Sequence, residues 1–172
     1  MFQKEFFGGD GNAKTRCVDT GVAANRIAVF PESRCLQREF NLDLIQAQMN
    51  VEETFAQLKE YDAFRVSLES TIHAAVHFGI GGINGGDMGT TPGSTNDPFF
   101  WIHHSNIDRC WAEWQGLSKK NLMSYGGLVD EKASKTSDQV PAGELQRYFV
   151  DGWNTKMIRV SDTFNWCNVK YE

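Results

Sequence analysis

The sequence predicts a mainly α-helical domain with irregular segments at both ends, and three observations lead to this fold class. Apolar residues recur every four positions through residues 63–78, a spacing that places them on one face of a helix. Asp97 and Pro98 open a second, aromatic-rich helical run over residues 98–115. Signals for strands are few, and only residues 27–30 predict a short one.

The N-terminal third is expected to be largely irregular. Glycines interrupt the start of residues 1–49, which offer no sustained periodicity. A first helix is predicted over residues 51–60, because Asn50 can cap it and Glu53 stands three residues further on. The segment therefore leads into the helical part of the chain.

The central helix is predicted over residues 63–78, with Asp62 as its cap and Gly79 as its end. Its apolar face comprises Phe64, Leu68, Ile72 and Val76. Residues 79–97 follow as a glycine-rich loop of the kind that is often functional.

The helix over residues 98–115 has a strong start signal. Asp97 can accept hydrogen bonds from first-turn amides, and Pro98 occupies a position that needs no N–H. Residues 116–143 are polar and rich in turn formers, and a last helix is predicted over residues 143–152.

The overall composition suits one domain, residues 1–172, with enough apolar residues for a core. The net charge of −5 and the pI near 5.4 argue against nucleic acid or an anionic membrane as a partner. The sequence lacks the roughly 18 consecutive apolar residues that indicate a membrane span, and its first residues are too short and polar for a secretory signal. The compartment therefore stays unassigned.

The four cysteines form no CxxC pair, which argues against a zinc ribbon or a thioredoxin-like motif. They are compatible with one or two disulfides, and Cys17 with Cys35 is the expected pair.

Histidines are concentrated on the two long predicted helices. On the first, a polar stripe with a spacing of four runs through Arg65, Glu69, His73 and His77. This spacing brings His73 and His77 close enough to share one metal ion. Surface histidine pairs at this spacing are common, but here the stripe borders the apolar face of the helix.

On the second helix, adjacent histidines point about 100° apart. His104 falls in the longer apolar stripe, whereas His103 falls in a weaker line with Phe99 and Cys110. We therefore expect His104 to face inward and to join His73 and His77 in a three-histidine site, which suits copper or zinc. For His103 we expect a supporting hydrogen bond.

The motifs HAAVH at residues 73–77, GGDM at 85–88 and NDPFFWIHHSNIDRCWAEWQ at 96–115 resemble the second copper-binding half of the tyrosinase, catechol oxidase and hemocyanin group of type 3 copper proteins. The resemblance is closest to short fungal tyrosinase-like proteins. It implies a partial helical bundle of the dicopper-centre type. It also implies a copper ion held by His73, His77 and His104.

Further residues take implied roles from the same resemblance. Glu69 corresponds to the acidic residue that orders a water for phenol deprotonation. Ala74 stands where many monophenol hydroxylases have asparagine, which favours diphenol oxidation, and Thr91 corresponds to a residue that gates the site. Asp108 and Arg109 match the HHxxxDR pattern and are expected to be structural.

The resemblance also implies a missing part. A type 3 centre uses two coppers and six histidines, whereas this sequence has four histidines. The first copper half is therefore expected to be absent from residues 1–172 and to be supplied in cis or in trans.

The favoured interpretation is a fragment of a copper oxidase that converts phenols or o-diphenols to quinones with O2. One alternative is a degenerate domain that binds one copper or none and serves as a binding or scaffold protein. Another is a zinc site for hydrolysis.

Overall fold

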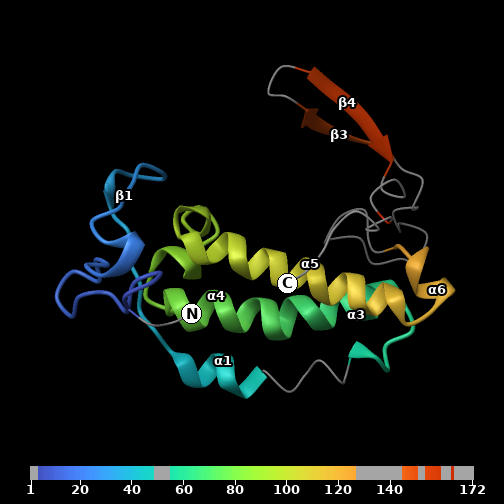
Figure 1. The fold of residues 1–172 in the computed structure, drawn as a ribbon, viewed down its shortest axis with the longest axis horizontal. Coiled ribbons are helices and arrows are strands. Elements are labelled where there is room, and N and C mark those ends of the chain that lie inside the picture. The colour runs from blue at the N-terminus through green and yellow to red at the C-terminus, as the bar shows by residue number, and fades with distance from the viewer. Residues whose placement is uncertain (1–3, 49–54, 127–144, 151–153, 160–163, 165–172) are drawn as a thin grey trace. The chain divides into compact units, whose positions relative to one another are not determined.

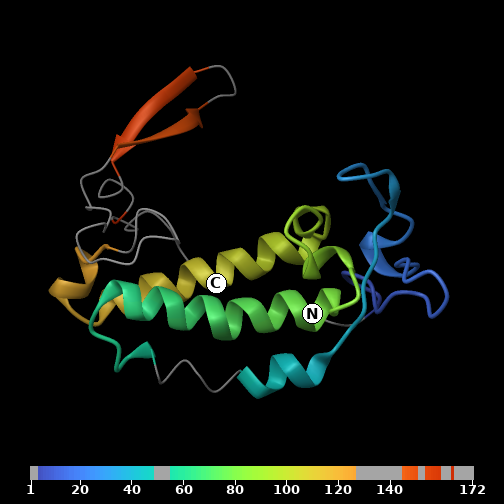
Figure 2. The same cartoon turned by 180° about the vertical axis from the view of Figure 1, so that it is seen from behind.

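The computed structural model describes residues 4–48, 55–126, 145–150, 154–159 and 164 (Figures 1 and 2). The described elements are mainly helical, which confirms the predicted fold class. The chain divides into two compact units, of which the first comprises residues 1–53 and 68–108 and the second residues 54–67 and 109–172. No helix in the described part of the chain has the length and hydropathy to cross a membrane.

The helix predicted over residues 63–78 is confirmed as a helical run with wider bounds. It comprises α3 (Tyr61–Leu68), one π-helical turn η3 (Glu69–His73) and α4 (Ala74–Gly81). Asp62 lies inside the first turn, where its carboxylate accepts from Arg65, and is not the cap. A π-helical turn inserts one extra residue, and such turns are frequent at functional sites.

Gly79 does not end the central helix, contrary to the prediction. The helix continues to Gly81 and stops at Gly82, whose φ of 66° is the left-handed conformation that favours glycine. Gly79 instead lies against Ile45, where an added Cβ would collide with that side chain. The glycine therefore allows two helices to approach each other.

The partner helix is α1 (Leu42–Gln48), which packs beside α4 in both views (Figures 1 and 2). This helix corrects the expectation that residues 1–49 contain little regular structure. The prediction of a helix over residues 51–60 is wrong for residues 56–60, which form turns and bends. Its predicted cap, Asn50, lies outside the described residues.

The start of α5 (Pro98–Gly116) agrees with the prediction for residues 98–115. The Asp97 carboxylate accepts a hydrogen bond from the amide of Phe99 at 2.9 Å. This satisfies a first-turn donor that has no partner within the helix. The glycine-rich loop before it contains two single 3-10 turns, η4 (Asp87–Gly89) and η5 (Ser94–Asn96).

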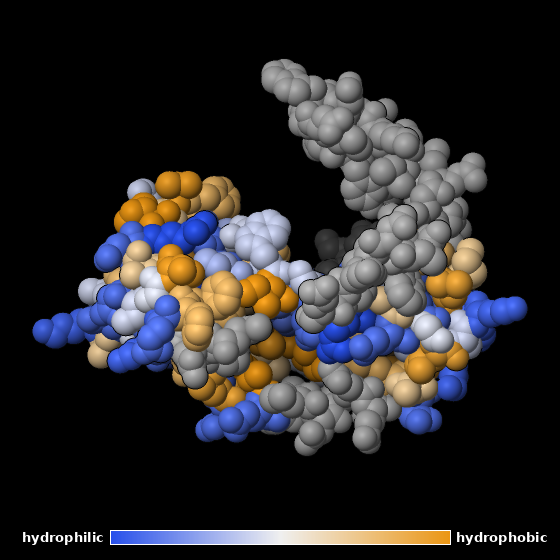
Figure 3. Space-filling model, viewed as in Figure 1, coloured by the Kyte–Doolittle hydropathy of each residue, from blue (hydrophilic) through white to orange (hydrophobic). Residues whose placement is uncertain are grey.

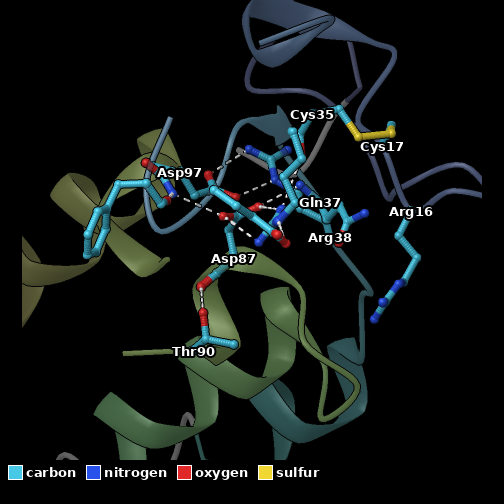
Figure 4. Close-up of polar contacts among 12 residues, drawn as sticks. Arg16, Cys17, Cys35, Gln37, Arg38, Asp87, Thr90 and Asp97 are labelled. Carbon is cyan, nitrogen blue, oxygen red and sulfur yellow. Dashed lines mark hydrogen bonds and ion pairs between the residues drawn. A yellow bond between two sulfur atoms is a disulfide. The ribbon is translucent and has the colours of Figure 1, made fainter. Parts of the chain in front are cut away.

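The N-terminal segment is held by short elements and by the predicted disulfide. After the turn η1 (Gly21–Ala23), β1 (Ile27–Ala28) pairs in antiparallel fashion with β2 (Arg34–Cys35). The strand predicted over residues 27–30 is thus confirmed only over its first half. Cys17 and Cys35 form a disulfide, as predicted (Figure 4). Apolar side chains around β1 are exposed (Figure 3), namely Ile27, Val29 and Phe30.

The second unit has an aromatic core. The rings of Phe64 and Trp114 stack at 4.8 Å, and the Trp114 indole donates to the carbonyl of Leu58 at 2.8 Å. Within residues 116–143 a short helix that the sequence did not predict, α6 (Lys119–Leu122), is capped by Ser118.

The prediction of a last helix over residues 143–152 is wrong for residues 145–150, the part of this range that the structure describes. Residues Leu145–Val150 form strand β3, which pairs in antiparallel fashion with β4 (Asn154–Arg159). The sequence of β3 ends in Tyr148, Phe149 and Val150. Aromatic and β-branched residues favour strands, and the segment had no helical periodicity to oppose this preference.

Candidate metal centre

The four histidines of the chain come together in the first unit. His73 ends the π-helical turn η3, His77 lies one turn further in α4, and His103 and His104 lie in α5. The Nε2 atoms of His77 and His104 are 3.3 Å apart. The ring of His73 lies 4.6 Å from that of His77 and 5.2 Å from that of His104, measured between centroids. Three imidazoles from two helices thus converge on one point.

A pocket of about 390 Å³ opens at this point. Its wall includes the three imidazoles of His73, His77 and His104, whereas the imidazole of His103 does not line it. The remaining wall is largely apolar and aromatic, with contributions from Phe78, Met88 and Phe100. The ring of Phe100 lies 4.1 Å from that of His104. The three imidazoles are therefore accessible to an ion and to a small aromatic molecule.

The orientation of His77 is set by a backbone carbonyl. Its Nδ1 lies 2.7 Å from the carbonyl oxygen of Met88 in the turn η4. Because a carbonyl oxygen only accepts, Nδ1 must be the protonated nitrogen. The lone pair of Nε2 is then directed toward His104 and the pocket.

His103 has a different environment. It is buried, with 5% of its surface exposed, and its Nε2 lies 3.2 Å from the carbonyl oxygen of His73. By distance alone, ring nitrogens of His73, His77 and His103 lie within 4.8 Å of one another and form a possible metal group. However, the contact with the carbonyl requires a proton on Nε2 of His103, so this nitrogen cannot be a ligand. His104 is the better third donor, because its imidazole lines the pocket.

The burial of the two adjacent histidines differs from the sequence expectation. His103 is the more deeply buried, together with Phe99 and Cys110, whereas His104 is half-buried at the pocket wall. His104 does face His77, but the expectation that it is the more inward of the two adjacent histidines is wrong, because His103 is the more deeply buried. Stripe counting did not locate the buried face of α5, because its apolar residues continue around the helix.

Burial favours the neutral form of His73, His103 and His104 by lowering the pKa of each. The pKa of His103 is lowered to about 3, mainly by burial and further by the nearby His77, His73 and His104. Burial also lowers the pKa of His73 and of His104, and the neighbouring histidines add to both effects. The carboxylate of Glu69 acts in the opposite direction on His73. Neutral imidazoles have the free lone pair that a metal ion requires.

The other residues singled out in the sequence fall into two groups. Glu69, Ala74 and Thr91 all line the pocket, with Glu69 and Thr91 exposed. Asp108 is exposed on α5 and does not line the pocket. Arg109 pairs with Glu113 one turn further along the same helix, at 2.5 Å.

Comparison with known proteins decides the family. Residues 4–117 match the common central domain of tyrosinase. The chain belongs to the tyrosinase family of type 3 copper proteins.

Tyrosinases from several organisms are among the similar proteins. The tyrosinase of Neurospora crassa is 27% identical over 143 residues, which cover 72% of this chain and 20% of that protein. The tyrosinase of Streptomyces antibioticus is 45% identical over 94 residues, covering 49% of this chain and 33% of that protein. A hemocyanin of Enteroctopus dofleini is 42% identical over 115 residues, covering 66% of this chain and 9% of that protein. The chain thus spans a third or less of these relatives.

The donor set fits the copper of the tyrosinase family. Three imidazole nitrogens form a ligand set that suits copper, and the adjoining pocket would admit a small molecule beside them.

Two supporting features escaped the sequence analysis. The Met88 carbonyl that orients His77 is a backbone group, so no residue type could reveal it. The contact between the rings of Phe100 and His104 was detectable, because the two residues are four apart on a helix.

Proposed function

We propose that His73, His77 and His104 bind one copper ion and form one half of a type 3 copper centre. This centre would oxidise phenols and o-diphenols to quinones with O2, with diphenols preferred. The observation that supports this proposal is the convergence of three imidazoles on the wall of a pocket large enough for a small aromatic ring.

The second half of the centre must come from elsewhere. The whole sequence has four histidines, and Nε2 of His103 is hydrogen-bonded to the backbone carbonyl of His73. A six-histidine centre therefore needs three ligands that this sequence does not contain. We propose that they come from a further segment of a longer polypeptide or from a second chain.

The pocket residues suit a phenolic substrate. When bound, the copper pair supplies the redox chemistry by which O2 accepts two electrons from the substrate. The flat rings of Phe78 and Phe100 offer stacking surfaces for an aromatic ring. Glu69, exposed at the pocket, can accept the proton that a phenolic hydroxyl releases. Thr91 is short and leaves the entrance open.

The preference for diphenols rests on Ala74. Its methyl group lines the pocket beside His73 and offers no hydrogen-bonding group to hold a water. Deprotonation of a monophenol would benefit from such a water, whereas an o-diphenol loses its protons as it is oxidised. We therefore expect diphenols as the better substrates of the completed centre.

Copper binding by the isolated chain tests the proposed ligands. We expect one copper per chain by elemental analysis of dialysed protein. His104→Ala should weaken copper binding by about 100-fold or more, whereas His103→Ala should weaken it by no more than the roughly 10–100-fold typical of supporting partners. Equal losses in both variants would contradict the assignment of His104.

Activity measurements separate the proposed function from the alternatives. Catechol oxidation should appear only when a protein or segment with the other three ligands is added to the copper-loaded chain. One bound copper without oxidation in the presence of such a partner would favour a non-catalytic binding domain. Selective retention of zinc over copper would favour a hydrolytic site.

A further inference from the structure

A second group of residues lies close to His77 without contacting it. The carboxylate of Asp87 is at the centre of this group. This carboxylate is fully buried, with 0% of the residue exposed. Arg34 donates to both of its oxygens, at 2.8 and 3.1 Å. The amide of Gln37 and the side chain of Asn96 also donate to it, at 2.7 and 3.1 Å. The carboxylate thus accepts four hydrogen bonds from two parts of the sequence, the segment of residues 34–37 and the nearby Asn96.

These bonds fix the backbone turn that Asp87 begins. The amide of Asp87 donates to the carbonyl of Gln37 at 2.9 Å, and the Asp87 carbonyl accepts from the amide and hydroxyl of Thr90 (Figure 4). Both ends of the turn η4 are therefore held. Met88, the middle residue of the turn, is buried with 1% exposed. Its carbonyl has little freedom to rotate.

The fixed carbonyl is the one that contacts Nδ1 of His77, at 2.7 Å. We propose that Arg34 and Asp87 are positioning residues for His77: by holding the Met88 carbonyl in place, they keep the proton of His77 on Nδ1 and present Nε2 to the metal. The inference rests on the proposed function, because it concerns how a proposed copper ligand is oriented. Arg34 and Asp87 act through the turn and do not line the pocket.

The physical basis is the tautomer choice of a neutral histidine. The hydrogen bond made by one ring nitrogen decides which nitrogen carries the proton. If the Met88 carbonyl moved away, Nε2 could carry the proton and would then have no lone pair for a metal. Removal of partners that orient a ligating histidine typically weakens metal binding by about 10–100-fold.

The experiment uses the whole chain with 15N-labelled histidine, without metal and then with copper. Long-range 1H–15N spectra report the protonated nitrogen of each imidazole. The variants are Asp87→Asn and the milder Arg34→Gln, whose side chain is 21% exposed in the parent. Glu32→Gln is the matched control, because Glu32 contacts Arg34 from the solvent side at 3.8 Å with its side chain 76% exposed.

We expect His77 to be protonated at Nδ1 in the parent and in the control. In Asp87→Asn and Arg34→Gln, a substantial fraction should shift to Nε2, and copper affinity should fall about tenfold or more. His103 is the internal reference, because its Nε2 proton depends on the His73 carbonyl. A merely structural role would leave the tautomer of His77 unchanged or alter both histidines together, and either result would overturn the proposal.

Failure of the two proposals can be distinguished. If the parent binds no copper, the proposed function fails, whereas the tautomers of the metal-free protein still decide whether Arg34 and Asp87 position His77. If the parent binds copper and Arg34→Gln changes neither the tautomer nor the affinity, the positioning role fails and the proposed function stands.

Discussion

At the scale of single residues, His103 and His104 show what a sequence can and cannot separate. Helical geometry shows that two adjacent histidines cannot point the same way. It does not show which of them lies at the pocket, because apolar residues occupy more than one face of α5. The structure distinguishes them by their partners: His103 contacts a carbonyl, and His104 lines the pocket.

Acid should destabilise the metal-free protein through the buried His103. Its pKa is lowered to about 3 in the folded protein, from the ordinary histidine value of 6.5 that applies to the unfolded chain. Between these values the unfolded chain binds a proton that the folded chain does not, so stability is present above pH 6.5 and is lost as the pH falls. The free energy of unfolding should fall by up to about 1.4 kcal/mol per pH unit from this group. His73 and His104 act with the same sign.

Urea unfolding at pH 7 and pH 5 measures this dependence. His103→Gln is the control, because the glutamine amide can still donate to the His73 carbonyl but does not titrate. A slope in His103→Gln equal to that of the parent would contradict the role of His103.

At the scale of elements, Gly79 shows why the end of a helix is difficult to predict from sequence. The central helix and α5 were predicted because their apolar spacing and the Asp97 cap are local signals. The sequence predicts Gly79 as a helix end, whereas the structure places it inside α4 in contact with α1. This contact depends on a helix that the sequence did not predict. A residue without a side chain cannot indicate by itself which use it has.

The two buried glycines of α4 should respond differently to alanine. At Gly79 the added Cβ would meet the side chain of Ile45, whereas at Gly81 it would meet the backbone of Gly89 in the loop that holds the site. Gly79→Ala should cost about 1–3 kcal/mol in free energy of unfolding, as overpacking typically does. Much of this cost should disappear when Ile45→Ala is added, because Ile45 then leaves space.

A double-mutant cycle of thermal or urea unfolding measures the coupling. Gly81→Ala should be the more damaging change, and Ile45→Ala should not relieve it. Equal relief of both glycine variants by Ile45→Ala would contradict the contact assignment.

At the scale of the molecule, long-range polar contacts hold the N-terminal segment on the helical site. The pair Arg34–Asp87 reaches the turn beside His77, and Arg38–Asp97 reaches the start of α5 (Figure 4). The disulfide was predictable because few cysteines leave few pairings. The ion pairs join residues more than 50 positions apart, and one sequence offers many charged partners for each arginine.

The Arg38–Asp97 pair is the last test, because both side chains are fully buried, with 0% exposed. Arg38→Met should cost about 3–5 kcal/mol in free energy of unfolding, since it leaves a buried carboxylate without its counter-charge. In Arg38→Met with Asp97→Ser the charge is gone, while the serine hydroxyl can still cap α5 at Phe99. The double variant should therefore be more stable than Arg38→Met alone in urea unfolding of the metal-free chain. A double variant less stable than the single one would mean that Asp97 acts mainly as a helix cap and not as the partner of Arg38.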